Sequence, residues 1–189
     1  YIDGFNFYYG LKKAPWKKYY WLDIVKLMES FLRPNQELIA VKYFSARPTD
    51  VGKRKRQDAF FQANKENPKF KLILGKYLKK EIECFKCHNI IHTYEEKESD
   101  VRIATQIVAD AYQHNCDLAI IVSADSDMIP AVELAKAKGI YCVGMTAANG
   151  AKMAELCDEC IAVPAKVTAR AQEMHILIGH ILCELVDGE

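Results

Sequence analysis

The feature that most constrains the fold is an apolar segment that ends abruptly at two aspartates. Residues 118–122 are all apolar, Asp125 and Asp127 follow shortly after, and a helical pattern begins at once. An apolar run of this length between turn residues predicts a strand buried on both faces, as in a parallel sheet covered by helices. The carboxyl end of such a strand is where ligands bind in α/β sheets.

The start of the chain repeats this arrangement, because Tyr1 and Ile2 lead directly into Asp3. Carboxylates that end two separate buried strands meet at one edge of a parallel sheet. They repel each other unless a cation lies between them. We therefore expect a site assembled from distant parts of the sequence, with a divalent metal as its occupant.

Apolar and amphipathic segments alternate along most of the chain. The predicted strands are 1–3, 38–45, 71–74, 118–122, 140–145 and 160–163. The predicted helices are 6–13, 23–32, 50–65, 99–114, 127–139, 148–156 and 165–185. This alternation predicts a three-layer α/β/α, Rossmann-like fold with a mainly parallel sheet. Neither GxGxxG nor GxxxxGK[ST] occurs, which argues against a dinucleotide or P-loop site.

Residues 76–97 break the alternation and predict a β-hairpin insertion with Cys84 and Cys87 at its turn. One CxxC pair supplies two zinc ligands, and His88 or His92 could add others. Two thiols on a hairpin without metal are the alternative, which we favour at this point. Haem attachment through CxxCH is a third interpretation, but a reducing compartment argues against it.

The seven cysteines are odd in number and mostly scattered. Cys116, Cys142 and Cys183 stand among apolar neighbours and are expected to be buried. This usage is typical of a reducing compartment, so we expect a cytoplasmic protein. No apolar run approaches the roughly 18 residues of a membrane span. The chain opens on Tyr1 rather than Met, which suggests that a longer N-terminus precedes it.

Charge is distributed unevenly along the chain. Residues 1–97 hold 20 Lys and Arg against 11 Asp and Glu, a net charge of +9, whereas residues 98–189 hold 6 against 14, a net charge of −8. The densest basic run is Lys53, Arg54, Lys55 and Arg56. A basic region beside an acidic site favours contact with RNA. The alternative is that these lysines and arginines only form a solvated surface.

Asp100 opens a predicted helix and lies four residues before Ala104, on the face of the apolar stripe. We therefore expect it to point toward the same sheet edge as Asp3, Asp125 and Asp127. The alternative is local: Asp100 and Asp127 are both good first-turn residues, and aspartate also satisfies turns.

Neutral oxygen groups accompany the acids, since Asn6 follows Asp3 and Ser123 precedes Asp125. A set of ligands made only of oxygen suits Mg²⁺ or Mn²⁺ better than zinc. Such metals activate water and neutralise a phosphoryl transition state. The combination favours phosphoryl chemistry.

Three motifs carry a resemblance to a known family. They are Asp3-Gly4-Phe5-Asn6, residues 96–101, and residues 121–130 with Gly139 closing the next helix. In order and spacing the chain resembles the NYN domain, the LabA-like branch of the PIN-like nucleases, over residues 1–163. Residues 164–189 would add a C-terminal helix. The resemblance implies metal-dependent cleavage of RNA, with Asp3, Asp100, Asp125 and Asp127 as metal-site acids and Asn6 as a helper.

One position departs from the family pattern. Relatives usually carry another aspartate six residues after the position of Asp100, and here that residue is Gln106. Fewer carboxylates imply weaker metal binding, or one metal instead of two. An RNA-binding regulator on the same fold is therefore the second hypothesis, and a phosphohydrolase of small nucleotides is the third. The final helix is expected to cover the sheet, or to form a homodimer contact.

Overall fold

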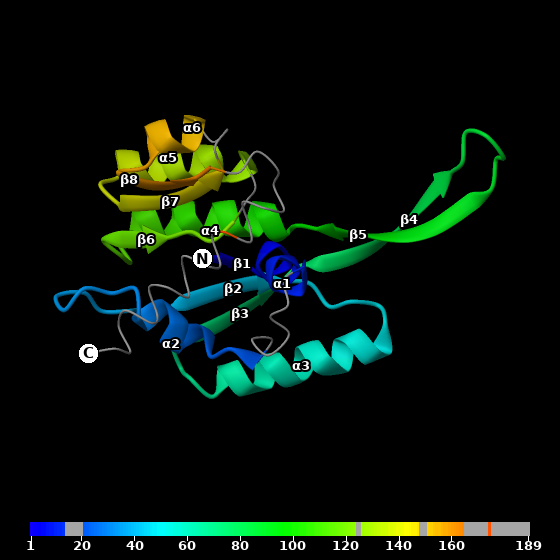
Figure 1. Ribbon diagram of the computed structural model, residues 1–189, viewed down its shortest axis with the longest axis horizontal. Coiled ribbons are helices and arrows are strands. Elements are labelled where there is room, and N and C mark those ends of the chain that lie inside the picture. Colours follow the sequence, from blue (N-terminus) through cyan, green and yellow to red (C-terminus); the bar gives the residue numbers. More distant parts are fainter. Residues whose placement is uncertain (14–20, 124–125, 148–150, 165–173, 175–189) are drawn as a thin grey trace.

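A computed structural model describes residues 1–13, 21–123, 126–147, 151–164 and Met174, and it shows an α/β fold with helices on both faces of a sheet (Figure 1). The strands are β1 Ile2–Asp3, β2 Val41–Ser45, β3 Phe70–Leu74, β4 Lys76–Glu83, β5 Ile90–Lys97, β6 Leu118–Ile120, β7 Tyr141–Ala147 and β8 Glu159–Val163. The helices are α1 Gly4–Lys13, α2 Ile24–Glu29, α3 Val51–Lys65, α4 Ser99–Gln113, the 3₁₀ turn η2 Ser126–Met128, α5 Ile129–Ala137 and α6 Ala151–Leu156.

Two parallel three-stranded sheets, β1-β2-β3 and β6-β7-β8, join through the first strand. Ile2 pairs with Val122 in parallel, and the Asp3 backbone N–H donates to the Val122 carbonyl at 2.9 Å. The combined order is therefore β3-β2-β1-β6-β7-β8, with every strand parallel. After β1, the chain adds β2 and β3 on one side of that strand, and later adds β6, β7 and β8 on its other side. The point of reversal, where ligands bind in such sheets, lies between β1 and β6.

Each face of the sheet has its own hydrophobic core. Successive residues of a strand point to opposite faces, so Tyr43 packs with Ile24 and Phe61, whereas Phe44 packs with Ile103 and its neighbours. Helices α2 and α3 thus cover one face, and α4 and α5 cover the other. The predicted three-layer arrangement is confirmed.

The observed boundaries of the elements differ from the predicted ones by a few residues. The predicted helices and strands that fall within the described residues are present. Asp23 and Asp50 are the N-caps of α2 and α3, and the Asp50 carboxylate accepts from the Lys53 N–H at 2.7 Å. The helix predicted to begin at residue 127 begins later, because Met128 occupies the N-cap position of α5. Asp127 instead lies in the preceding 3₁₀ turn.

The predicted hairpin insertion is confirmed as the antiparallel pair β4 and β5, with Lys76 opposite Lys97 at its base. It extends away from the rest of the molecule (Figure 1). Because β4 follows the carboxyl end of β3, the hairpin leaves the molecule at the same edge where β1 ends at Asp3.

A buried carboxylate ties α4 to the first two strands. Asp110 is 2% exposed and accepts hydrogen bonds from Tyr1 Oη at 2.5 Å and Asn115 Nδ2 at 3.0 Å, and it pairs with Lys42. Burial opposes ionisation of Asp110, but the hydrogen bonds from Asn115, Lys42 and Tyr1 outweigh it and lower its pKa below the ordinary 3.8.

Replacing Asp110 with Asn should lower the free energy of unfolding at pH 7 by about 2 kcal/mol, since it removes a charged hydrogen-bond partner. A carboxylate with a depressed folded-state pKa stabilises the native state above its unfolded pKa and loses that effect as pH falls through its folded pKa. The difference between wild type and variant should therefore be smaller at pH 3 than at pH 7. Urea titrations at both values measure it, and an equal difference at both would contradict the assignment.

No described helix has the length and apolar character needed to cross a membrane. The predicted C-terminal helix 165–185, with its expected role in covering the sheet or forming a dimer, lies outside the described residues apart from Met174. Cys183 lies outside them as well.

Candidate active site at the carboxyl edge of the sheet

Asp3 is the centre of the candidate site. It ends β1, is 5% exposed, and its Oδ1 accepts from the backbone N–H groups of Phe5 and Asn6, both at 3.0 Å. Its Oδ2 accepts from the Asn6 side-chain amide and from Ser123 Oγ at 3.2 Å. The structure thus brings Asp3, Asn6 and Ser123 together, as predicted, although Ser123 is 120 residues away in the chain. Four donors hold this carboxylate in one orientation.

Gly4 allows this turn from strand to helix. A Cβ atom at position 4 would lie 2.6 Å from the Phe44 carbonyl oxygen and against the Tyr43 ring. Only glycine lets α1 begin directly after Asp3 while the backbone passes this close to β2. The close approach places Asn6 within reach of Asp3.

Asp100 and Asp127 lie on elements that surround Asp3. Asp100 is in the first turn of α4 and Asp127 is in η2, and α4 packs against both β1 and η2. Both carboxylates are exposed. Asp125 lies outside the described residues, and within the described part no three His, Cys, Asp or Glu side chains are arranged to hold a metal. Convergence of the four predicted acids remains a prediction.

The predicted apolar stripe of α4 is confirmed. Ile107 and Ala111 are buried, and Ala104 and Val108 pack against the same core. Asp100 lies one turn before Ala104 on this side of the helix, in the first turn, where its side chain is exposed. Its direction toward the edge that carries Asp3 stays a prediction.

Gln106 does not bring another acid into the site. Its side-chain amide donates to Asp110 Oδ1 at 3.3 Å. Asp110 lies ten residues after Asp100, which is about 15 Å along the helix, and it is engaged with Lys42. Asp110 therefore does not replace the aspartate that the family resemblance predicts at position 106.

Ser45 is a polar residue at this edge that the sequence analysis did not single out. It is buried at the end of β2, one register position beyond the partner of Asp3, and accepts from Gln57 Nε2 at 3.1 Å. The signal was available, since Ser45 ends an apolar strand as Asp3 does.

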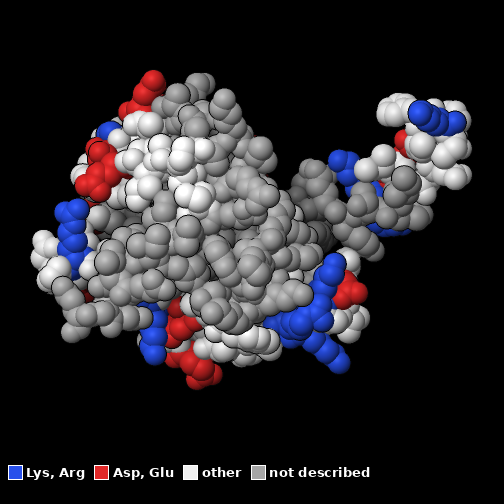
Figure 2. All heavy atoms as spheres, in the orientation of Figure 1, with Lys and Arg blue, Asp and Glu red and all other residues white. Residues whose placement is uncertain are grey.

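Positive charge flanks the acidic edge of the sheet. Helices α1 and α3 begin just after the carboxyl ends of β1 and β2, and α4 begins where the hairpin returns to this edge. Helix N-termini carry partial positive charge, although Asp3 accepts from the first N–H groups of α1 and Asp50 accepts from Lys53 in α3. Lys53, Arg54, Lys55 and Arg56 lie exposed in the first half of α3, and Figure 2 shows Lys and Arg side chains gathered there.

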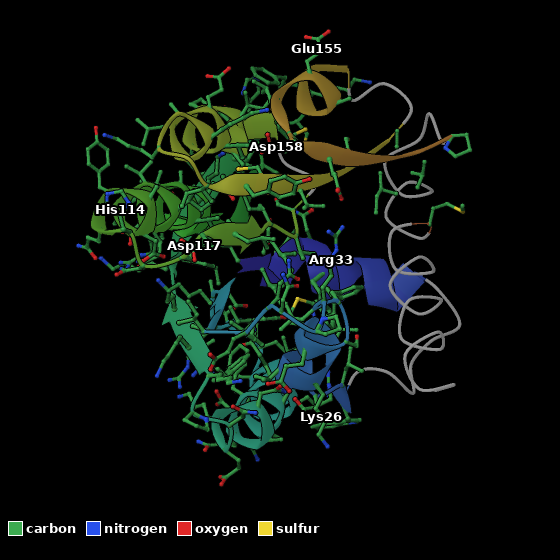
Figure 3. The ribbon with its side chains drawn as sticks, turned by 90° about the vertical axis from the view of Figure 1, so that its left-hand side faces the viewer. Lys26, Arg33, His114, Asp117, Glu155 and Asp158 are labelled. Carbon is green, nitrogen blue, oxygen red and sulfur yellow. The ribbon has the colours of Figure 1, made fainter. Side chains whose placement is uncertain are left out.

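The opposite edge, viewed in Figure 3, carries ion pairs that connect elements of the fold. Asp158 pairs with Lys136 at 3.1 Å and accepts from the Cys142 N–H at 2.9 Å, and Arg33 pairs with Glu159 at 3.7 Å. The Cys142 N–H and Lys136 lower the pKa of Asp158. These contacts pair Asp158 with Lys136 and Arg33 with Glu159 within the fold.

A sequence profile of the NYN domain matches residues 1–163. The chain belongs to the NYN-domain family. NYN domains have the PIN-like α/β fold of a nuclease superfamily, and in this NYN domain the edge that carries Asp3 is the carboxyl edge of its parallel sheet. The family resemblance inferred from the three motifs is confirmed over the same residues.

The chain is also similar to part of several isomerases. It is 49% identical over 83 residues to a phosphoheptose isomerase of Aneurinibacillus thermoaerophilus, covering 43% of this chain and 42% of the relative. It is 48% identical over 62 residues to the phosphoheptose isomerase of Rhodospirillum rubrum, covering 33% of each chain. For phosphoheptose isomerase 2 of Campylobacter jejuni the identity is 42% over 87 residues, covering 46% of this chain and 43% of the relative. The chain thus spans less than half the length of these relatives.

The two similarities share residues. Only 26 residues, 164–189, follow the part matched by the NYN profile, and the 83-residue similarity is longer than that. Some residues of the NYN domain are therefore also similar to a phosphoheptose isomerase.

Proposed function

We propose that this NYN domain is a Mg²⁺- or Mn²⁺-dependent ribonuclease that hydrolyses phosphodiester bonds at the carboxyl edge of its sheet. The observation that carries the proposal is Asp3, a buried carboxylate held by Asn6 and Ser123 at the reversal point of the sheet. Membership of a nuclease superfamily supports it.

The chemistry of the predicted metal site fits a hard divalent cation. The acids proposed as ligands are Asp3, Asp100, Asp125 and Asp127, with Ser123 as a neutral oxygen beside Asp3. No sulfur or imidazole belongs to this set, as Mg²⁺ and Mn²⁺ prefer. When bound, such a metal supplies an activated water and neutralises charge on the phosphoryl group.

The remaining roles belong to the chain itself. Asn6 and Ser123 orient the Asp3 carboxylate through hydrogen bonds to its Oδ2. The N-termini of α1 and α3 stabilise the negative charge of a phosphodiester at this edge. The basic residues of α3 hold the flanking phosphates of the strand.

A cleavage assay tests the proposal. The purified chain, freed of metal, should cleave single-stranded or structured RNA only after Mg²⁺ or Mn²⁺ is added. EDTA should stop the reaction, and Ca²⁺ should support it poorly, because Ca²⁺ prefers more ligands and a looser geometry. Metal-dependent RNA binding without any cleavage would favour the RNA-binding regulator instead, which Gln106 already supports.

The basic helix gives a separate prediction for RNA affinity. Reversing Lys53 and Lys55 to Glu should weaken RNA binding and reduce the slope of log affinity against log salt by at least about 1.4, since two phosphate contacts are lost. Reversing Lys26 and Lys138, which lie far from this helix's first turns in the sequence, is the matched control. An unchanged slope in the Lys53 and Lys55 variant would show that this helix only contacts solvent.

A second candidate function follows from the similarity to phosphoheptose isomerases. It would make the chain a binder or isomerase of a heptose phosphate, and it shares with the first candidate the recognition of a phosphoryl group. The similar stretch covers less than half of those enzymes, so a complete isomerase site is the weaker proposal. Measuring isomerisation of a heptose phosphate, with the RNA assay run in parallel, separates the two.

A further inference from the structure

The tip of the β4–β5 hairpin carries cysteine chemistry that the proposed nuclease does not use. The tip is a closed turn, because the Cys84 N–H donates to the Asn89 carbonyl at 3.0 Å and the His88 N–H donates to the Cys84 carbonyl at 2.8 Å. His88 takes a left-handed conformation, with φ of 55°. This turn holds Cys84 and Cys87 together at the end of the arm that projects from the molecule (Figure 1).

The environment of the tip thiols differs from that of the other cysteines. Backbone N–H groups of Lys86 and Cys87 donate to the Cys84 sulfur, and the Cys87 side chain lies beside it. By contrast, Cys142 is buried in the core. Backbone donors aimed at a sulfur on an accessible turn suit a metal-binding cysteine, because a cysteine binds metal as the thiolate.

The tip supplies only half of a zinc site. Structural zinc takes four ligands, yet no third His, Cys, Asp or Glu joins Cys84 and Cys87 within the described residues. The His88 ring lies 2.6 Å from Glu83 through its Nδ1. His92 is opposite Glu81 in the hairpin register, three positions below Cys84, or roughly 10 Å along the strand. Among the described side chains of the hairpin, Cys84 and Cys87 are thus two ligands of a site that needs two more.

The surface of the tip favours a second copy of the same chain. Phe85, between the two cysteines, is 99% exposed, and Ile82 and Ile90 are 45% and 59% exposed. Ile82 and Ile90 lie on opposite faces of the hairpin, so exposed apolar side chains flank Phe85 on both sides of the tip. Such side chains gain by packing against another surface. Strand β4 holds both lysines and glutamates, including the Lys79–Glu81 pair at 3.2 Å, so two tips do not repel strongly.

We propose that Cys84 and Cys87 from two copies of the chain bind one zinc ion between them and join the copies at their hairpin tips. Two copies related by a two-fold axis supply four equivalent thiolates, which completes a tetrahedral site. Binding releases the four thiol protons to solvent and leaves a centre with a net charge of −2. The backbone N–H groups of the turn stabilise that charge. This inference does not depend on the nuclease proposal, because the tip is separate from Asp3.

Metal titration and mass measurement together test the inference. Metal-free protein, kept reduced with a phosphine, is titrated with Zn²⁺ or Co²⁺ and followed by sedimentation. We expect saturation at one ion per two chains, a mass that doubles with binding, and a Co²⁺ spectrum typical of four thiolates. Chelation should return the monomer. One ion per chain in a monomer, or no binding at all, would overturn the proposal.

Variants separate this site from its alternatives. Cys84→Ser and Cys87→Ser should each abolish both metal binding and dimer formation. Cys157 and Cys160 form a second CxxC pair in the sequence, and Cys160→Ser should change neither property. The same holds for His92→Ala. Phe85→Ser should retain the metal and weaken the dimer at least fivefold. If Phe85→Ser lowers RNA affinity while zinc has no effect on mass, the tip is an RNA contact and the zinc proposal is wrong.

Discussion

Replacing Asp3 with Asn is expected to lower the rate of metal-dependent RNA cleavage by a factor of about 10³ or more. Removing one carboxylate from a metal site forfeits several kcal/mol of transition-state stabilisation, which corresponds to a loss of this size. The assay compares single-turnover rates at saturating Mg²⁺. Asp117→Asn is the matched control, because Asp117 is exposed at the opposite edge (Figure 3). This variant should cleave RNA at the wild-type rate.

Thermal stability gives a second measurement that does not require activity. Binding of Mg²⁺ to the native state raises the melting temperature by mass action. The wild type and Asp117→Asn should show this increase, and Asp3→Asn should not. Since Asp3 is buried, its variant could also lose stability for structural reasons, so Asp127→Asn, at an exposed position, provides a second test. Equal Mg²⁺ effects in all four proteins would exclude Asp3 and Asp127 as ligands.

The sequence predicted the sheet well because its strands are short apolar runs between turn residues. Residues 118–122 and 140–145 have this form, which is typical of a parallel sheet covered by helices. The edge of the site followed from the same reasoning, since Asp3 ends such a run. The insertion was found because residues 76–97 lack any helical period.

Other features depend on tertiary contacts that no local pattern contains. The bond from Ser123 to Asp3 joins residues 120 positions apart, and its geometry requires β1 to lie beside the segment after β6. The Lys42–Asp110 pair likewise depends on how α4 crosses β2. The predicted start of a helix at residue 127 was displaced, because a 3₁₀ turn occupies residues 126–128 before α5 begins.

Among changes in stability, the largest we expect comes from Gly4→Ala, which should lower the free energy of unfolding by about 3 kcal/mol. The new Cβ would lie 2.6 Å from the Phe44 carbonyl oxygen, a backbone atom that cannot rotate away. Relief requires α1 to move from β2, which also moves Asn6 away from Asp3. Cleavage should therefore fall along with stability, and urea titrations at 25 °C measure the first effect.

Gly52→Ala provides the comparison within the same protein. Gly52 lies in the first turn of α3, and its added Cβ would meet only Asp50 Oδ1 at 3.4 Å and Arg56 Nη1 at 3.7 Å, both ends of side chains. Alanine is the better helix former, so this variant should gain about 0.5 kcal/mol and retain activity. If both variants behave alike, close backbone contact is not what position 4 requires. If only Gly4→Ala is impaired, the approach of α1 to β2 positions Asn6 against Asp3.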